Sequence, residues 1–290
     1  MQFKHLGVVG YGEVGKIFAA GLAPHVGAVS TWDLQFSDNR VRGAVPAGVQ
    51  ACASFQELYA QADLVVSAVT ASSALDVSED AGMCIREGSI YLDLNSVSPS
   101  TKKRSASMLA AGGAHYVDAG VMASVPPYGI RVPMLLGGPK AEELAEALRG
   151  WGMDAKAVSN EVGVASAIKM CRSVVVKGME ALVMESYAAA RHYGVEEHML
   201  ATLAETFPGI DWQQQGSYFF QRVAQHGKRR AEEMFEAART VRDAGLDPTM
   251  ATATAHKQDA MARLARARLF ADLGPDARWQ GYADRLLGKE

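Results

Sequence analysis

Residues 6–22 read LGVVGYGEVGKIFAAGL, and this stretch decides the fold of the first half of the chain. A short apolar run, Leu6–Val9, leads into a glycine turn, and a helical pattern follows. The turn has the spacing Gly10-x-Gly12-x-x-Gly15. Gly10 permits a tight turn, Gly12 lets the backbone approach a pyrophosphate, and Gly15 lets the helix pack closely on the strand. This pattern is typical of a dinucleotide-binding fold, in which free N–H groups at the start of the helix bind the pyrophosphate.

An acidic residue follows at the distance that such a fold requires. Asp33 ends the next apolar run, VSTWD, 18 residues after Gly15. A carboxylate there accepts hydrogen bonds from the adenosine ribose and repels a 2′-phosphate, so it favours NAD. Arg40 and Arg42 follow soon after, and they keep NADP open as the alternative cofactor. A strand–helix turn without a ligand is the other interpretation of the motif. The expected cofactor site also includes the residues between the glycines, Tyr11, Glu13 and Val14.

The composition is that of a globular protein without a polyionic partner. Apolar residues make up 49% of the 290 residues, and the net charge is −3. We therefore expect neither nucleic acid nor an anionic membrane as a partner. Three scattered cysteines without a CxxC spacing indicate a reducing compartment, and the histidine spacing predicts no metal site. We expect no signal peptide before the first strand, and no apolar run has the roughly 18 residues of a membrane span, so we predict a cytoplasmic protein.

Short apolar runs alternate with helical segments up to about residue 157. This alternation predicts an α/β Rossmann-type domain over residues 1–158, with a doubly wound, mainly parallel sheet covered on both faces. Ligands of such sheets bind beyond the carboxyl ends of the strands. The expected strands are Leu6–Val9, Val29–Trp32, Leu64–Ala68, Ile90–Leu94, Tyr116–Asp118, Val132–Leu136 and Ala155–Val158, and the expected helices lie near Glu13–Ala23, Ser54–Tyr59, Ser72–Ala81, Pro99–Ala111 and Lys140–Arg149.

Residues 159–290 contain no strand pattern and predict an all-α domain for substrate binding and dimerisation. Glu161–Tyr193 has few helix breakers and is expected to form one long helix that is apolar on more than one side. A monomer would leave much of such a helix exposed, so we expect a homodimer. Glycines such as Gly227 divide the rest. The further helices are expected around Glu196–Thr206, Asp211–Gln225, Arg229–Ala244 and Met250–Ala271.

The segment Asp93-Leu94-Asn95-Ser96-Val97-Ser98-Pro99 places amide and hydroxyl groups between an apolar strand and a helix. It resembles the D-x-(S/N)-(S/T)-x-S-P loop of the β-hydroxyacid dehydrogenase superfamily, which includes 3-hydroxyisobutyrate and 6-phosphogluconate dehydrogenases. In that family the loop binds the substrate, so the resemblance implies this role for Asn95 and Ser96, with Asn95 also beside the cofactor. The resemblance also places the backbone at Val69 and Thr70 beside the nicotinamide ribose. An ordinary helix cap is the alternative interpretation of the loop.

The segment Asp118-Ala119-Gly120-Val121-Met122-Ala123-Ser124 departs from the family pattern D-A-P-V-S-G-G. In the family the last three residues of that pattern touch the substrate. The resemblance therefore places Met122, Ala123 and Ser124 at the substrate and implies a less polar pocket of a different shape. The substrate of a familiar member is not carried over.

Residues 163–169, GVASAIK, are similar to the segment that carries the family's catalytic lysine. The similarity implies that Lys169 is the general acid/base, which takes the hydroxyl proton as hydride leaves. A lysine can do this where burial lowers its pKa. Ser173 stands one helical turn further on, where the family usually has Asn, and could still hydrogen-bond a substrate oxygen. Arg172 and Lys177 would suit an anionic small-molecule substrate, and an interdomain salt bridge with Glu180, Glu185 or Asp211 is the alternative for Lys177.

The run KMCRSVVVKGMEAL from Lys169, followed by Arg229-Arg230-x-x-Glu233-Met234, resembles a particular branch of the superfamily. This is the phosphogluconate-dehydrogenase-like branch with an uncharacterised C-terminal domain. The resemblance implies an NAD(P)-dependent oxidoreductase that transfers a hydride between nicotinamide and the hydroxyl of a β-hydroxy acid or related sugar acid. Two alternatives stay open. One is an imine reductase of the same fold, a group that usually carries Asp or Tyr in place of the lysine, and the other is a non-catalytic NAD(P)-binding sensor.

Overall fold

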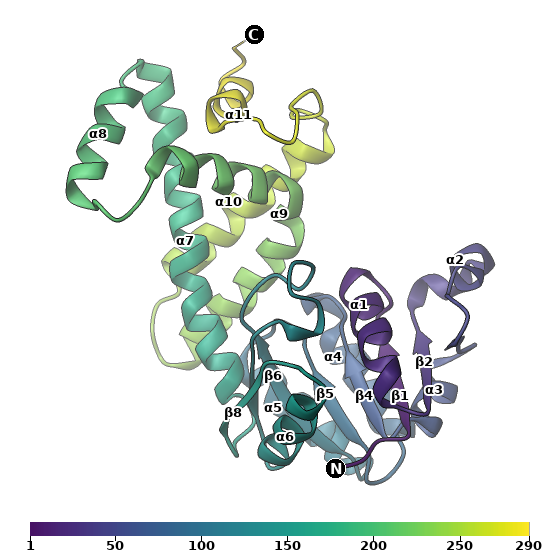
Figure 1. Ribbon diagram of the computed structural model, residues 1–290. Coiled ribbons are helices and arrows are strands. Elements are labelled where there is room, and N and C mark those ends of the chain that lie inside the picture. Colours follow the sequence, from purple (N-terminus) through teal and green to yellow (C-terminus); the bar gives the residue numbers. More distant parts are fainter. Residues whose placement is uncertain (290) are drawn as a thin grey trace. The chain divides into compact units, whose positions relative to one another are not determined.

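The computed structural model describes residues 1–289. The chain forms two compact units, Met1–Met170 and Cys171–Glu290. Among the described residues every strand lies in the first unit, and the second is built from helices (Figure 1). The sequence placed a boundary at residue 158, before the long helix, whereas the division between the two units falls inside that helix.

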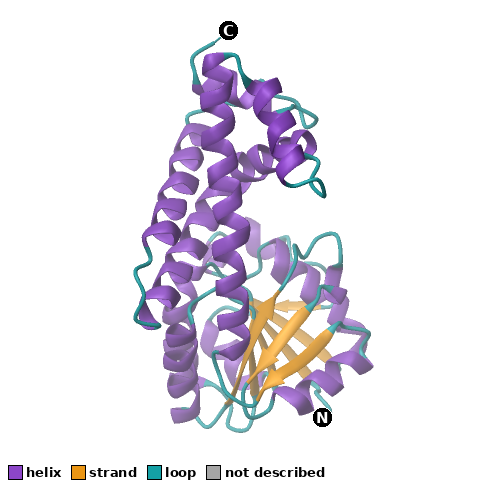
Figure 2. Ribbon diagram, turned by 90° about the vertical axis from the view of Figure 1, so that its left-hand side faces the viewer, coloured by secondary structure: helices purple, strands orange, loops and turns teal. Residues whose placement is uncertain are grey.

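The strands of the first unit form one sheet in the order β3-β2-β1-β4-β5-β6-β7-β8 (Figure 2). Neighbouring strands run parallel except β6 and β7, which are antiparallel. The predicted doubly wound, mainly parallel sheet is therefore confirmed. The strand order reverses between β1 and β4, and ligands of such sheets bind at this kind of switch point. The strands are β1 (His5–Val9), β2 (Ala28–Trp32), β3 (Val49–Ala51), β4 (Leu64–Ser67), β5 (Ile90–Asp93), β6 (His115–Val121), β7 (Met134–Gly137) and β8 (Ala155–Ser159).

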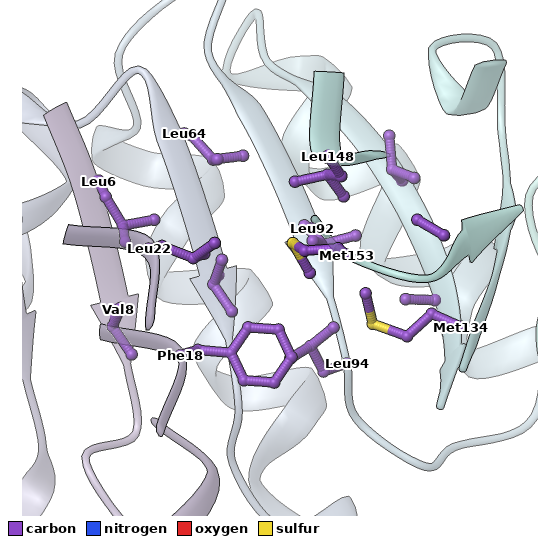
Figure 3. Packing of buried hydrophobic residues seen from close by; sticks show 14 of the residues in the cluster. Leu6, Val8, Phe18, Leu22, Leu64, Leu92, Leu94, Met134, Leu148 and Met153 are labelled. Carbon is purple, nitrogen blue, oxygen red and sulfur yellow. The ribbon is translucent and has the colours of Figure 1, made fainter. Parts of the chain in front are cut away.

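Helices cover both faces of the sheet. Successive side chains of a strand point to opposite faces, and apolar side chains on each face pack against a layer of helices. On one face Leu6 and Leu92 belong to a cluster that includes Phe18 of α1 and Leu148 of α6 (Figure 3). On the other face Tyr91 packs with α3, α4 and α5. The central strands are thus apolar on both sides, which is why the sequence shows them as continuous apolar runs. The helices of this unit are α1 (Glu13–Leu22), α2 (Asn39–Gly43), α3 (Phe55–Gln61), α4 (Ala74–Cys84), α5 (Pro99–Ala111) and α6 (Ala141–Gly150).

One predicted helix boundary in the second unit is wrong. Its third helix runs without interruption through Gly227, where the sequence predicted a break. The reason lies in packing, since a Cβ added at Gly227 would lie 2.7 Å from the backbone oxygen of Gln258 on α10. The glycine lets two helices approach closely and does not end either of them. The helices are α7 (Val164–Tyr193), which begins in the first unit, and α8 (Glu196–Thr206), α9 (Trp212–Asp243), α10 (Thr249–Arg266) and α11 (Trp279–Leu286).

Aromatic side chains form the core of the second unit. Tyr187 and Trp279 lie edge to face with ring centroids 4.9 Å apart, and Phe220 packs against Trp279. Within residues 1–289 no helix combines the length and apolarity of a membrane span.

The close approach at Gly227 predicts a large effect of a single methyl group. Gly227→Ala should lower the free energy of unfolding by about 1–3 kcal/mol, because the added methyl overlaps backbone atoms of α10. This loss should appear although alanine is intrinsically better in a helix by about 1 kcal/mol. Urea denaturation followed by circular dichroism measures the change.

Gly178 of α7 provides the matched control. A Cβ there would meet only Thr254 Oγ1, at 4.0 Å, which is an ordinary contact. Gly178→Ala should leave the stability unchanged or raise it. Equal losses in the two variants would show that packing against α10 is not the reason for Gly227.

Candidate active site

The glycine turn after β1 is shaped by close backbone contacts. Gly10 has φ +85°, and a Cβ there would lie 2.6 Å from the Ala68 carbonyl oxygen. A Cβ at Gly15 would overlap the Gly10 carbonyl. These two glycines are therefore required by the turn itself, before any ligand is considered.

Gly12 is different, because an added Cβ would meet nothing within 4 Å. It stands at the N-cap of α1, with no side-chain cap, and Glu13 and Val14 begin the helix. An open approach to backbone N–H groups at a helix N-terminus fits the pyrophosphate of a dinucleotide. The turn therefore fits NAD or NADP on its own geometry.

Asp33 connects this turn to the end of β2. One carboxylate oxygen accepts a hydrogen bond from Tyr11 N at 2.7 Å, and the other accepts from Gln35 N at 2.9 Å. The Tyr11 ring packs against Phe36 with centroids 6.0 Å apart. Because an ionised carboxylate has about four acceptor sites, Asp33 can bind these two amides and still accept from ribose hydroxyls.

Asn95 connects the ends of β4 and β5. Its side-chain oxygen accepts from Val69 N at 2.7 Å, and its amide nitrogen donates to Ser67 Oγ at 2.9 Å. The side chain is buried, with 3% exposed. Thr70 follows Val69, and its hydroxyl bonds those of neighbouring serines. Asn95 therefore fixes the backbone at Val69, which the resemblance places beside the nicotinamide ribose.

Lys169 and Ser96 lie directly against each other. Lys169 Nζ donates to Ser96 Oγ at 2.6 Å, and both side chains are half-buried. Ser96 follows β5, and Lys169 lies on the second turn of α7. Gly120 of β6 gives the helix room, because a Cβ there would lie 2.8 Å from the Ala165 carbonyl oxygen. The structure thus brings together the predicted acid/base and one of the predicted substrate-binding hydroxyls.

The start of α7 is held by a carboxylate that the sequence analysis did not single out. Asp118 of β6 accepts hydrogen bonds from Gly163 N, Ser166 N and Ser166 Oγ at 3.1, 2.9 and 2.9 Å. Its side chain is fully buried. Hydrogen bonds and charge at a helix N-terminus both favour this arrangement.

Lys102 of α5 was also missed, and it is fully buried beside Asp118 and Asp93. The sequence did carry a signal for it. Lys102, Ser105 and Leu109 share one helix face at positions i, i+3 and i+7, and all three are buried. A lysine on the inward face of a helix needs partners, which a search for motifs alone does not reveal.

The segment predicted to touch the substrate follows β6. Met122 N donates to Pro133 O at 2.8 Å, Ala123 packs on the core of the sheet, and Ser124 is exposed. The substrate contacts of these three residues stay predictions.

Ser173, Arg172 and Lys177 belong to the second unit, and their roles at the substrate also stay predictions. Ser173 is buried and Arg172 is exposed. Lys177 is buried and forms an ion pair of 2.5 Å with Glu233, a partner that the sequence analysis did not consider. Burial lowers the pKa of Lys177, and the Glu233 carboxylate opposes this shift.

The two arginines of the C-terminal motif form separate ion pairs, Arg230 in a buried group and Arg229 at the surface. Arg230 pairs with Glu180, which also accepts from Gln258 Nε2 at 3.1 Å. Arg229 pairs with Glu233 at 2.8 Å. No group of His, Cys, Asp and Glu within residues 1–289 could hold a metal ion.

The open space at Gly12 means that a methyl group there can affect cofactor binding without affecting the stability of the fold. Gly12→Ala should leave the thermal midpoint unchanged, because the methyl group meets no protein atom. It should weaken NAD binding by about tenfold or more, since the methyl group occupies the path of the pyrophosphate. Fluorescence titration with NADH measures the loss. Gly15→Ala serves as the contrast and should lower stability itself, and unchanged NADH affinity in Gly12→Ala would contradict the assignment.

Comparisons with known proteins show the family of the chain. Residues 5–147 match the NAD binding domain of 6-phosphogluconate dehydrogenase, and residues 190–261 match a domain of unknown function, DUF1932. A conserved hypothetical protein from Sinorhizobium meliloti is 35% identical, with 98% of this chain and 95% of that chain covered and a TM-score of 0.77. Another conserved protein of unknown function, with structural similarity to 3-hydroxyacid dehydrogenases, is 32% identical over 91% of this chain and 98% of that chain, with a TM-score of 0.69.

More distant matches include characterised enzymes. The mitochondrial 3-hydroxyisobutyrate dehydrogenase of Drosophila melanogaster is 24% identical over 72% of this chain and 65% of its own length. An imine reductase of Streptomyces aurantiacus shares the fold, at 19% identity over 98% of this chain and 99% of that chain, with a TM-score of 0.57. The resemblance inferred from the motifs is thereby confirmed. The chain belongs to the NAD-binding, 3-hydroxyacid dehydrogenase-like family in which an NAD binding domain of the 6-phosphogluconate dehydrogenase type is joined to a DUF1932 domain.

Proposed function

We propose that the protein is an NAD(P)-dependent dehydrogenase that oxidises the hydroxyl of a β-hydroxy acid or related sugar acid, or catalyses the reverse reduction. The observation that carries this proposal is the 2.6 Å contact between Lys169 Nζ and Ser96 Oγ. It lies past the carboxyl end of β5, two strands from the glycine turn after β1. A hydroxyl placed between these two groups would have a base and a hydrogen-bonding partner.

The proposed chemistry assigns one proton transfer to the protein. In its neutral form Lys169 takes the substrate hydroxyl proton and becomes an ammonium ion, and Ser96 hydrogen-bonds the same oxygen. Bound nicotinamide would supply the hydride acceptor. In the reverse direction the Lys169 ammonium returns the proton to the carbonyl oxygen. Asn95 holds the neighbouring backbone at Val69 in place.

The proposed pocket differs from that of a familiar hydroxyacid dehydrogenase. Met122 and Ala123 replace polar or small residues and favour a substrate with an apolar portion, and Ser124 completes this segment. Ser173 is proposed to hydrogen-bond the substrate. Arg172 and Lys177 are proposed to attract the negative charge of the substrate. The ion pair with Glu233 already neutralises part of the charge of Lys177.

NAD is the proposed cofactor in preference to NADP. The Asp33 carboxylate lies at the end of β2 and is held towards the glycine turn by Tyr11 N. A 2′-phosphate brought to this place would meet a negative charge.

The decisive test compares wild type with Lys169→Met on a panel of β-hydroxy acids and sugar acids, with NAD and NADP each supplied. Removal of the base should lower kcat by a factor of about 100 to 10,000 while NADH affinity stays the same. Lys103→Met, an exposed lysine on α5, is the matched control and should retain wild-type turnover. Equal turnover in wild type and Lys169→Met would refute the proposed acid/base. Reduction of cyclic imines that does not depend on Lys169 would favour an imine reductase.

We also propose that the protein is a homodimer. Val175 and Leu182 are seven residues apart on α7, and they are 63% and 57% exposed within the described chain. Residues at this spacing lie on one side of a helix, and a second copy would cover them.

The oligomeric state is measured by gel filtration with light scattering. Leu182→Glu should shift the protein towards the monomer, because a charge would be buried in the interface. Leu246→Glu is the control, since Leu246 is 65% exposed and lies outside α7. A wild-type monomer, or an identical response of both variants, would contradict the dimer proposal.

A further inference from the structure

Lys102 is a fully buried lysine between two fully buried carboxylates. Its Nζ lies 3.2 Å from Asp93 Oδ2 and 3.4 Å from Asp118 Oδ1. It also donates to the backbone oxygen of Asp93 at 2.8 Å. One ammonium group on α5 therefore links the end of β5 to the middle of β6.

The first carboxylate shapes the loop that carries Ser96. Asp93 Oδ1 accepts from Asn95 N at 2.8 Å, and Tyr116 donates its hydroxyl to Asp93 Oδ2. Burial and the nearby Asp93 raise the pKa of Tyr116, so the phenol stays protonated as the donor. Asp93 is thus engaged by donors from three elements, and its position sets the path of the chain into Ser96.

The second carboxylate holds the helix that carries Lys169. Asp118 accepts three hydrogen bonds from Gly163 and Ser166 at the start of α7. Lys169 follows Ser166 by three residues, so the two side chains move together with the first turns of the helix. A change in the position of Asp118 is transmitted to Lys169.

We propose that Lys102 is a positioning residue that sets the distance between Lys169 and Ser96. This inference rests on the proposed function, in which these two groups share the substrate oxygen. Lys102 acts on them through Asp93 on the loop and through Asp118 on the helix. Two buried carboxylates without the ammonium would repel each other, so they would separate or one would take up a proton. Either response changes the geometry of the loop or of the helix.

The first measurement does not depend on any substrate. Trace acetylation with acetic anhydride, read by peptide mass spectrometry, reports how reactive each lysine is. In Lys102→Met the labelling of Lys169 should change by at least about threefold, because the loss of its fixed hydrogen bond to Ser96 changes how free the amine is to react. Exposed lysines elsewhere in the chain serve as internal references. Lys103→Met, the adjacent exposed lysine on α5, is the matched control and should leave the labelling of Lys169 unchanged.

The second measurement is turnover with a substrate found by the panel. A displaced acid/base should lower kcat by about 100-fold in Lys102→Met, while the KM for the cofactor stays within about twofold of wild type. Turnover is expressed per NADH-binding site, because a loss of folding alone would lower the apparent kcat without changing the KM. If Lys102→Met does not fold, Ser166→Ala replaces it, because it removes one hydrogen bond of Asp118 and leaves the buried charges in place. It should change the labelling of Lys169 in the same direction, to a smaller extent.

The outcomes separate the two proposals. Unchanged labelling of Lys169 in folded Lys102→Met, or in Ser166→Ala where that variant stands in, overturns the positioning role whatever the activity. A change in the labelling together with the kcat loss supports it. A change in the labelling in an enzyme whose turnover is insensitive to Lys169→Met leaves the role of Lys102 in holding Lys169 standing, and it refutes the proposed acid/base instead.

Discussion

The three hydrogen bonds that Asp118 accepts from the start of α7 are the constraint on which the site in the first unit depends. A helix N-terminus has unpaired N–H groups, and a buried carboxylate needs donors, so each satisfies the other. Lys102 supplies the positive charge that a fully buried pair of carboxylates requires. The contact between Lys169 and Ser96 follows from this arrangement, because both groups stand on elements that the two carboxylates hold.

Features determined by local physical chemistry could be predicted from the sequence. The glycine turn was predicted from the spacing of its three glycines, and Gly15 is required by the backbone of Gly10, only five residues earlier. The helix at Pro99–Ala111 matches its predicted bounds, because Ser98 caps it and Pro99 suits its first turn. The helix at Glu196–Thr206 also has the bounds that the sequence predicted. The Rossmann sheet was predicted from apolar runs at regular intervals, and the structure contains it.

Features determined by distant partners could not be predicted. Gly227 reads as a helix breaker in isolation, and only the close approach of α10 shows why it lies inside a helix. Strand β3 spans three residues, too few to form a pattern. Lys102 has no motif, because its partners come from two other elements. The buried pair of Lys177 and Glu233 joins residues 56 positions apart, and no short spacing could indicate it.

Asn95 and Ser96 show how adjacent residues of one motif can have different tasks. Asn95 is turned inward, where its amide joins Val69 and Ser67, whereas Ser96 meets the ammonium of Lys169. Asn95 therefore contributes order to the backbone that follows β4, and Ser96 offers its hydroxyl to the proposed reacting site. A motif that is assigned to one ligand as a whole thus combines a residue that builds the site with a residue that can use it.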